Sequence, residues 1–253
     1  MAISAADVKT LREQTGVGML ACKKALEESN GDREKAVELL RKRGEAKAAS
    51  KADRSTSEGG IGIAGRAMIK LLCETDFVAR NEKFVALTEE LAQKAEAESA
   101  DAAKKHFESI KTDKIQEIGE NMSLDAVEVV EGGDTVGSYL HTNRKVGTIV
   151  VLDGGNEEQA RDVAMHATAM NPLVANPEDV PEEILAKERE IAREQLLGEG
   201  KPEQILDKII EGKMKKFCAE RALASQAFVK DPEQTVAQYL GDAKIVKFVR
   251  MAV

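Results

Sequence analysis

The sequence contains no tryptophan and few aromatic side chains, which make up 3% of its 253 residues. Proteins that bind single-stranded nucleic acid by stacking need aromatic platforms, so the composition argues against that mode of binding. The formal net charge of −8 argues in the same direction, because a surface that binds phosphate groups should be basic. We therefore expect no direct contact with nucleic acid.

Cysteine is also scarce. The chain has three cysteines, Cys22, Cys73 and Cys218. They form no C-x-x-C pair, which argues against a zinc site and against a disulfide framework. The histidines show no H-x-x-H or H-E-x-x-H spacing, and no G-x-x-x-x-G-K-[ST] motif is present. We expect no metal, no cofactor and no nucleotide bound by the chain itself.

Long apolar runs are absent as well, so the sequence predicts no membrane-spanning segment. Residues 1–7 lack the basic-then-apolar order of a signal peptide. Cytoplasm is therefore the expected compartment.

One glycine pattern is misleading. Gly60, Gly62 and Gly65 match the dinucleotide-binding fingerprint G-x-G-x-x-G. That fingerprint requires a strand before it and a helix after it. Here a polar segment precedes it and a strand is expected to follow. We interpret these glycines as parts of a tight β-hairpin.

Residues 1–44 are predicted to form three short helices, with apolar residues at helical spacing and a Gly-x-Gly loop after the first helix. Gly31 suits the left-handed position that follows the second helix, and Asp32 suits the cap of the third. The third helix is expected to end at Gly44. The pattern is typical of a ubiquitin-associated (UBA)-like module, which buries little surface and binds partners through a small apolar patch.

The rest of the chain predicts an α+β fold. Residues 45–58 are rich in Ala, Lys and Ser, which indicates a linker that is helical at its start. A hairpin, a loop and a helix then occur twice, so we expect two related core subdomains, 59–131 and 132–253, each with a small antiparallel sheet. Within the second, residues 181–223 predict a protruding hairpin of two charged helices.

Two helical segments are less regular. In the first subdomain a long helix through Phe84, Leu87 and Leu91 is followed by two short helical stretches, 102–110 and 113–119. In the predicted helical hairpin, the first helix should break at 198–200, and Pro202 should open the second.

One short segment combines a polar cap with an aromatic side chain between a strand and a helix: Thr75, Asp76, Phe77 and Val78. From local chemistry, Phe77 should fix the helix start to the core and Asp76 should cap it. The alternative is that Phe77 is exposed and meets a partner. Local chemistry alone favours the first interpretation.

Two runs of sequence resemble the bacterial translation elongation factor Ts family. LREQTGVGMLACKKAL at residues 11–26, followed by NGD at 30–32, is similar to the N-terminal module of that family. CETDFVA at residues 73–79 is similar to its strongest signature. Further matching runs extend the resemblance over nearly the whole chain: 114–121, 137–141, 164–169, 211–217 and 226–232.

The resemblance implies a guanine-nucleotide exchange factor that promotes GDP release from elongation factor Tu, with no bond chemistry of its own. In that family the Asp-Phe pair reaches into the G domain of the partner, where the Phe wedges between two helices and disturbs the Mg²⁺ site. The resemblance assigns this role to Thr75, Asp76, Phe77 and Val78. It also implies a set of partner contacts: Met19, Leu20, Lys23, Ile118, Gly119, His141, Phe228 and Val229.

Two departures from the family pattern stand out. An apolar residue is expected where Lys230 stands, which puts a contact there in question. Some family members continue past the last strand into a short helical module that grips the partner, and the sequence ends at Val253, before such a module.

Two alternatives from other functional classes stay open. The chain could be a UBA-type adaptor without exchange activity, which residues 1–44 alone support. It could be an enzyme that uses Cys73 or His141. Whichever of these functions it has, the chain could also form a homodimer.

Overall fold

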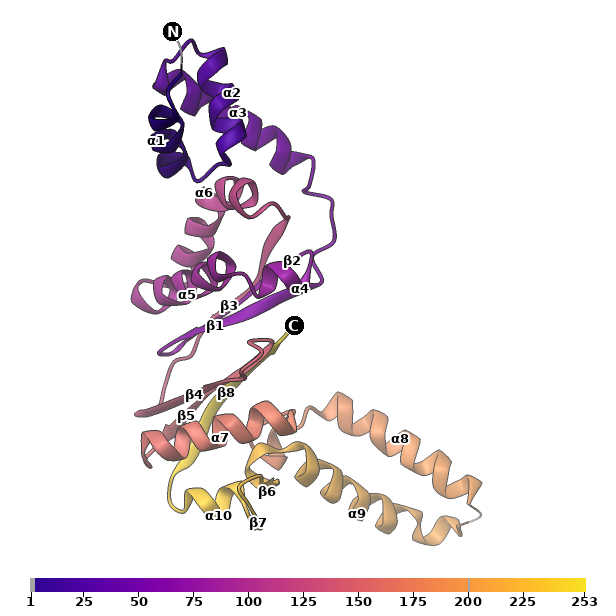
Figure 1. Cartoon of the computed structure of the whole chain (residues 1–253). Helices are drawn as coiled ribbons and strands as arrows, with labels where there is room; N and C mark the ends of the chain where they lie inside the picture. The colour runs from indigo at the N-terminus through magenta and orange to yellow at the C-terminus, as the bar shows by residue number, and fades with distance from the viewer. Residues whose placement is uncertain (1–2, 200) are drawn as a thin grey trace. The chain divides into compact units, whose positions relative to one another are not determined.

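The computed structural model of the protein describes residues 3–199 and 201–253 (Figure 1). It divides into two compact units. The first consists of Met1–Val129 with Ala252–Val253, and the second of Val130–Met251. Each combines helices with a small sheet, so the predicted α+β fold class is confirmed. Within the described residues, no helix has both the length and the apolar composition that crossing a bilayer requires.

The first unit begins with three helices, α1 (Ala5–Thr15), α2 (Met19–Glu28) and α3 (Arg33–Ala49). They bury one small apolar cluster, which includes Leu11, Cys22 and Leu26. Asp32 caps α3 as predicted, because its carboxylate accepts the amide of Lys35 at 3.1 Å. The helix does not end at Gly44 but continues to Ala49. The reason is local, since Glu, Ala and Lys are strong helix formers and outweigh one glycine.

The first sheet contains three antiparallel strands in the order β1-β2-β3: β1 (Glu58–Ala64), β2 (Ala67–Cys73) and β3 (Met122–Val129). Helices α5 (Glu82–Ala97) and α6 (Ala100–Ile118) cover one of its faces (Figure 1). Gly62 lies in β1 and Gly65 in the turn that leads to β2. A Cβ at Gly62 would come 2.3 Å from the carbonyl oxygen of Thr88 in α5, so this glycine also permits close helix packing.

Helix α6 corrects one prediction. Residues 100–118 form a single helix, where two short helical stretches were expected. Phe107 and Ile115 are eight residues apart, which places them on the same helix face, and both are buried in the same core cluster. Tertiary packing along that face therefore outweighs the weak helix propensities of Thr112 and Asp113 between them.

The second unit contains the sheet β4-β5-β8, formed by β4 (Thr135–Leu140), β5 (Val146–Asp153) and β8 (Lys244–Ala252). Helix α7 (Glu157–Met170) packs against β4 and β5 (Figure 1). Val150 and Val163 belong to the core between them.

Several short elements complete this unit. They are η1 (Pro177–Asp179), η2 (Leu223–Ser225), β6 (Ala227–Phe228), β7 (Asp231–Thr235) and α10 (Val236–Leu240). The sequence does not predict the β6–β7 ladder, because two short strands have too few residues to show an alternating pattern.

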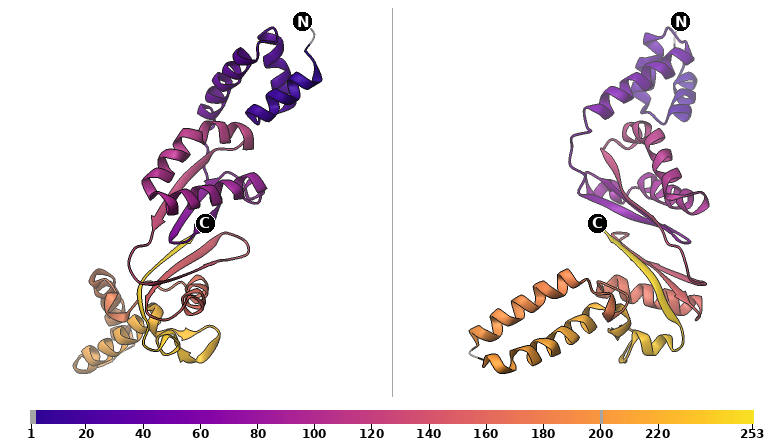
Figure 2. Two further views of the ribbon diagram at one scale, coloured as in Figure 1. Left: turned by 90° about the vertical axis from the view of Figure 1, so that its left-hand side faces the viewer. Right: turned by 180° about the vertical axis from the view of Figure 1, so that it is seen from behind.

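The predicted helical hairpin consists of α8 (Glu182–Gly198) and α9 (Glu203–Arg221), which lie side by side (Figure 2). The two helices share a small apolar cluster, made of Ala192, Leu196, Leu206, Ile210 and Met214. Of the predicted break at 198–200, Gly198 ends α8 and position 200 lies outside the described residues.

Candidate functional site

The segment of interest follows β2 and forms the four-residue helix α4 (Asp76–Ala79). Thr75 is its N-cap, since the Thr75 hydroxyl accepts the amide of Val78 at 3.4 Å. The prediction that Asp76 caps the helix is therefore wrong. The Asp76 carboxylate instead pairs with Arg80 at 3.0 Å, on the exposed side of the same turn.

Phe77 is the most exposed large apolar side chain among the described residues, with 84% of its surface accessible. The interpretation from local chemistry, in which Phe77 fixes the helix start to the core, is wrong. Ala79 and Val78 make the core contacts of α4 instead. Burying a phenylalanine is worth about 1.5–3 kcal/mol, so its exposure here leaves that free energy available to a partner.

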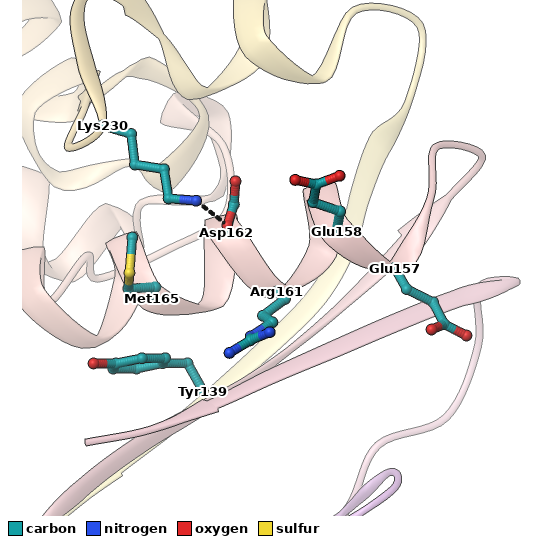
Figure 3. Close-up of a pocket in the computed structure, with 7 residues that line it drawn as sticks. All are labelled: Tyr139, Glu157, Glu158, Arg161, Asp162, Met165 and Lys230. Carbon is teal, nitrogen blue, oxygen red and sulfur yellow. Dashed lines mark hydrogen bonds and ion pairs between the residues drawn. The ribbon is translucent and has the colours of Figure 1, made fainter. Parts of the chain in front are cut away.

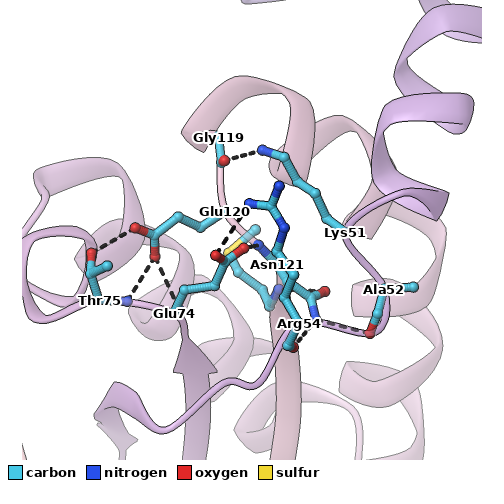
Figure 4. A network of polar contacts seen from close by, with 9 residues as sticks. Lys51, Ala52, Arg54, Glu74, Thr75, Gly119, Glu120 and Asn121 are labelled. Atoms are coloured by element: carbon cyan, nitrogen blue, oxygen red, sulfur yellow. Dashed lines mark hydrogen bonds and ion pairs between the residues drawn. The ribbon is translucent and has the colours of Figure 1, made fainter.

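A network of polar contacts holds the start of α4 (Figure 4). One carboxylate oxygen of Glu120 accepts the amides of Glu74 and Thr75, each at 3.0 Å. The other accepts the Thr75 hydroxyl at 2.6 Å. In return, Glu74 accepts the amide of Asn121 at 2.7 Å. This hydrogen bond holds the pKa of the Glu74 carboxyl below its usual value.

Ile118 and Gly119 lead directly into this network. Ile118 is half-buried against the core and is the last residue of α6. Gly119 ends the helix with a φ of 99°, a left-handed conformation that glycine adopts without strain. Its carbonyl accepts the ammonium of Lys51, which precedes β1. Glu120 follows them directly and accepts hydrogen bonds from residues 74 and 75, so both residues lie beside the Phe77 segment.

Met19, Leu20 and Lys23 lie in the first turns of α2. Leu20 is 68% exposed, and the three side chains line an apolar groove of about 440 Å³ that Ile3 and Val8 of the same module complete. Lys23 forms a long ion pair with Glu27, at 3.8 Å on the surface. The helical module therefore presents an apolar patch with a cation at its edge.

The family model described as Elongation factor TS matches residues 74–253. The chain belongs to the elongation factor Ts family. A protein named Elongation factor Ts from Idiomarina loihiensis is 43% identical over 268 residues, which cover 100% of this chain and 91% of the relative. Another of that name, from Aeromonas hydrophila, is 46% identical over 267 residues, covering 99% and 90%.

The remaining residues expected as contacts in an elongation factor Ts fall into two groups. His141 follows β4 directly and is exposed, and Val229 is 44% exposed. Phe228 is buried, and its ring stacks on Tyr239 with the centroids 4.3 Å apart. The ring of Phe228 fills the core of the second unit, and the expected partner contact at this residue stays a prediction.

Lys230, where the family pattern led us to expect an apolar residue, takes part in a polar cluster (Figure 3). Its ammonium pairs with Asp162 at 2.5 Å, and the Tyr239 hydroxyl donates to the other oxygen of Asp162 at 2.9 Å. Burial and the adjacent carboxylate raise the pKa of Tyr239 to about 12. Lys230 and Asp162 also line a cavity of about 540 Å³ with Tyr139 and Arg161.

Cys73, which one alternative made a nucleophile, is fully buried at the end of β2. Its thiol donates to the carbonyl oxygen of Thr75 at 3.2 Å. A buried thiol is out of reach of a substrate, so this position does not suit a nucleophile. In the part of the chain that the structure describes, no group of three or more His, Cys, Asp or Glu side chains is placed to hold a metal ion.

Sequence reasoning missed Glu120, although it lies inside the matching run 114–121. An acidic residue after a helix end carries no signal of its own. What reveals it is the approach of residues 74 and 75, which are more than 40 positions away in the chain.

Proposed function

We propose that this protein is a guanine-nucleotide exchange factor that binds elongation factor Tu and promotes the release of GDP, so that GTP can bind. Membership of the elongation factor Ts family supports the proposal. The observation that carries it is the position of Phe77, exposed on a short helix whose start is held by three hydrogen bonds to one carboxylate. Such work would take place in the cytoplasm.

The proposed mechanism is mechanical. Mg²⁺ requires near-ideal octahedral geometry, so small displacements of the elements around it weaken the bound nucleotide. Asp76 and Phe77, with Thr75 and Val78, enter the G domain of the partner and bind the displaced state better than the undisturbed one. The coupling is reciprocal, so nucleotide binding also weakens the complex and the factor is released unchanged.

The other predicted contacts would supply affinity. Met19 and Leu20 dock through the apolar groove of the helical module, and Lys23 faces an acidic group of the partner. Ile118 and Gly119 lie beside the wedge. His141 and Val229, in the second unit, hold a distant domain of the partner, so that the displacement acts against a fixed support.

The direct test uses elongation factor Tu loaded with a fluorescent GDP analogue and chased with excess unlabelled GDP. Catalytic amounts of this protein should accelerate release by orders of magnitude. Phe77→Ala should remove about 2 kcal/mol of this effect, roughly 30-fold in rate, because it deletes a buried aromatic anchor of the complex. Leu173→Ala, at an exposed apolar side chain outside the predicted contacts, is the control and should leave the rate unchanged.

A second candidate function is an adaptor that uses only the apolar groove of the helical module. It predicts binding to ubiquitin-like partners, which Leu20→Asp would abolish, and no effect on nucleotide release. No acceleration of release by the parent protein would favour this candidate. Exchange at the control rate by the Phe77→Ala variant would contradict only the wedge.

A further inference from the structure

We infer that Glu120 is a positioning residue of the exchange site: its carboxylate keeps Thr75, and with it the Phe77 wedge, in the conformation that meets the partner. The inference rests on the proposed function. It concerns a side chain that needs no contact with the partner and acts through the segment that makes the contact.

Three hydrogen-bond donors converge on the Glu120 side chain. Glu120 accepts two backbone amides and one hydroxyl, all from Glu74 and Thr75 (Figure 4). The Thr75 hydroxyl gives its proton to Glu120 and therefore offers a lone pair to the amide of Val78. The carboxylate thus determines the orientation of the N-cap itself. Hydrogen bonds to a charged acceptor are among the stronger ones in proteins.

Helix α4 is too short to be stable without external contacts. A helix of four residues is little more than its first turn, which is unfavourable to form in isolation. It therefore needs external contacts to persist. Its core contacts come from Val78 and Ala79, at its C-terminal side. Phe77 makes no core contact, because most of its surface is accessible. The N-terminal half of the helix therefore depends on the cap that Glu120 orients.

Glu120 is itself held in place by its neighbours. Gly119 before it ends α6, and the Asn121 amide after it donates to Glu74. The side-chain amide of Asn121 donates to the carbonyl oxygens of Ala52 at 3.2 Å and Arg54 at 2.9 Å. Backbone on both sides of Glu120 is thus tied to fixed neighbours. A rigid support pre-organises the wedge, and pre-organisation saves the entropy of ordering it on binding.

The test compares three variants of the full chain. Glu120→Ala removes the acceptor entirely. Glu120→Gln keeps one oxygen for the two amides but places an NH₂ group where the Thr75 hydroxyl needs an acceptor. Glu96→Ala is the matched control, because Glu96 also accepts a backbone amide, that of Arg66 at 2.9 Å, at the opposite end of the β1–β2 hairpin.

For nucleotide release, Glu120→Ala should lower the maximal rate by about 10-fold or more, the loss expected for hydrogen bonds to a charged group. The concentration for half-maximal effect should change by less than about twofold, since docking through α2 is unaffected. Glu120→Gln should restore part of the rate, and Glu96→Ala should match the parent. Equal losses in Glu120→Ala and Glu96→Ala would overturn the inference in favour of general destabilisation.

A second readout needs no partner. The chain has no tryptophan, so Phe77→Trp introduces a fluorophore whose signal comes from this site alone. In that background the fluorescence anisotropy should decay slowly, with the tumbling of the protein. Adding Glu120→Ala should introduce a fast nanosecond component, and adding Glu96→Ala should not. An unchanged decay after Glu120→Ala would overturn the inference.

The two readouts separate this inference from the proposed function. If the parent protein fails to accelerate release, the proposed function fails, and the anisotropy still decides whether Glu120 holds the segment. If release is accelerated and Glu120→Ala loosens the segment without lowering the rate, the exchange function stands and the positioning role is overturned.

Discussion

His166 is held in one neutral form by its two neighbours. Its Nδ1 accepts the amide of Val229 at 3.1 Å, so the proton resides on Nε2, which faces the side-chain oxygen of Gln226 at 3.0 Å. The amide group of Gln226 is oriented by its second contact, a hydrogen bond to the carbonyl of Glu220. Protonation of Nδ1 would place its N–H group against the N–H group of Val229, and both are donors. Burial also lowers the pKa of His166.

This arrangement makes stability depend on pH. In the unfolded chain His166 takes up a proton near pH 6.5, whereas the folded protein resists it. Because the unfolded state binds more protons, the free energy of unfolding should fall as the pH drops below about 6.5. Urea unfolding between pH 5 and 8 should show a shallower fall for His166→Gln than for the parent. His106→Gln is the control, and an equal effect from both variants would contradict this account.

Tyr239 should titrate abnormally. Its partly buried hydroxyl donates to Asp162, and its pKa is raised to about 12. In a Tyr139→Phe background it is the only tyrosine, so the tyrosinate absorbance should appear near pH 12. The stabilising contribution of this group is full below about pH 10 and is lost as the pH rises through about 12. A midpoint near 10 in the folded protein would contradict the predicted contact with Asp162.

At the scale of elements, helix packing on the second sheet depends on one glycine, which has no side chain to hold the helix away. Gly137 lies in β4, and a Cβ built there would come 2.2 Å from the backbone nitrogen of Arg161 and 2.3 Å from the carbonyl carbon of Ala160. Backbone atoms of a packed helix do not yield as a flexible side chain does. The close approach of α7 to β4 therefore requires glycine at this position.

Alanine substitutions at two glycines should consequently change the free energy of unfolding in opposite directions. Gly137→Ala should lower the free energy of unfolding by about 1–3 kcal/mol, since α7 must move away from the sheet. Gly212→Ala in α9 meets no atom within 4 Å and should raise it by about 0.5–1 kcal/mol, as expected in a helix interior. Denaturant unfolding measures both. A Gly137→Ala variant as stable as the parent would show that the helix is not in close contact there.

At the scale of the whole molecule, the proposed function assigns affinity and displacement to different parts of the chain. The groove of the helical module, with Leu20 at its edge, would provide affinity, and Phe77 would provide displacement. The two side chains belong to separate elements, α2 and α4, and share no partner in the described structure. Their effects on exchange should therefore be separable.

Kinetics on elongation factor Tu should show this separation. Leu20→Ala should raise the concentration for half-maximal exchange by about 5–10-fold, the loss of roughly 1 kcal/mol from an interface contact, and leave the maximal rate unchanged. Phe77→Ala should mainly lower the maximal rate. In the double variant the two free-energy effects should add. Strong non-additivity would argue that the two side chains act on the same step.

Much of the fold was predictable from the sequence because it depends on local rules. The three N-terminal helices, both β-hairpins and the α8–α9 pair follow from apolar periodicity, caps and turn residues. Asp32 caps α3 because its neighbours in sequence are its neighbours in space. The Thr75–Val78 segment was recognised by its similarity to a family signature, which is also a property of the local sequence.

Only the tertiary structure decided which of these residues are accessible and what supports them. Phe77 and Phe228 have similar sequence surroundings, yet one is exposed and the other fills a core. Periodicity shows which face of an element is apolar, but the segment that covers this face comes from elsewhere in the chain. Glu120 and Thr75 are 45 residues apart, and no local rule joins them. The sequence therefore determined the elements and marked the Thr75–Val78 segment. Packing determined the exposure and the support of this segment, because burial is a property of distant contacts.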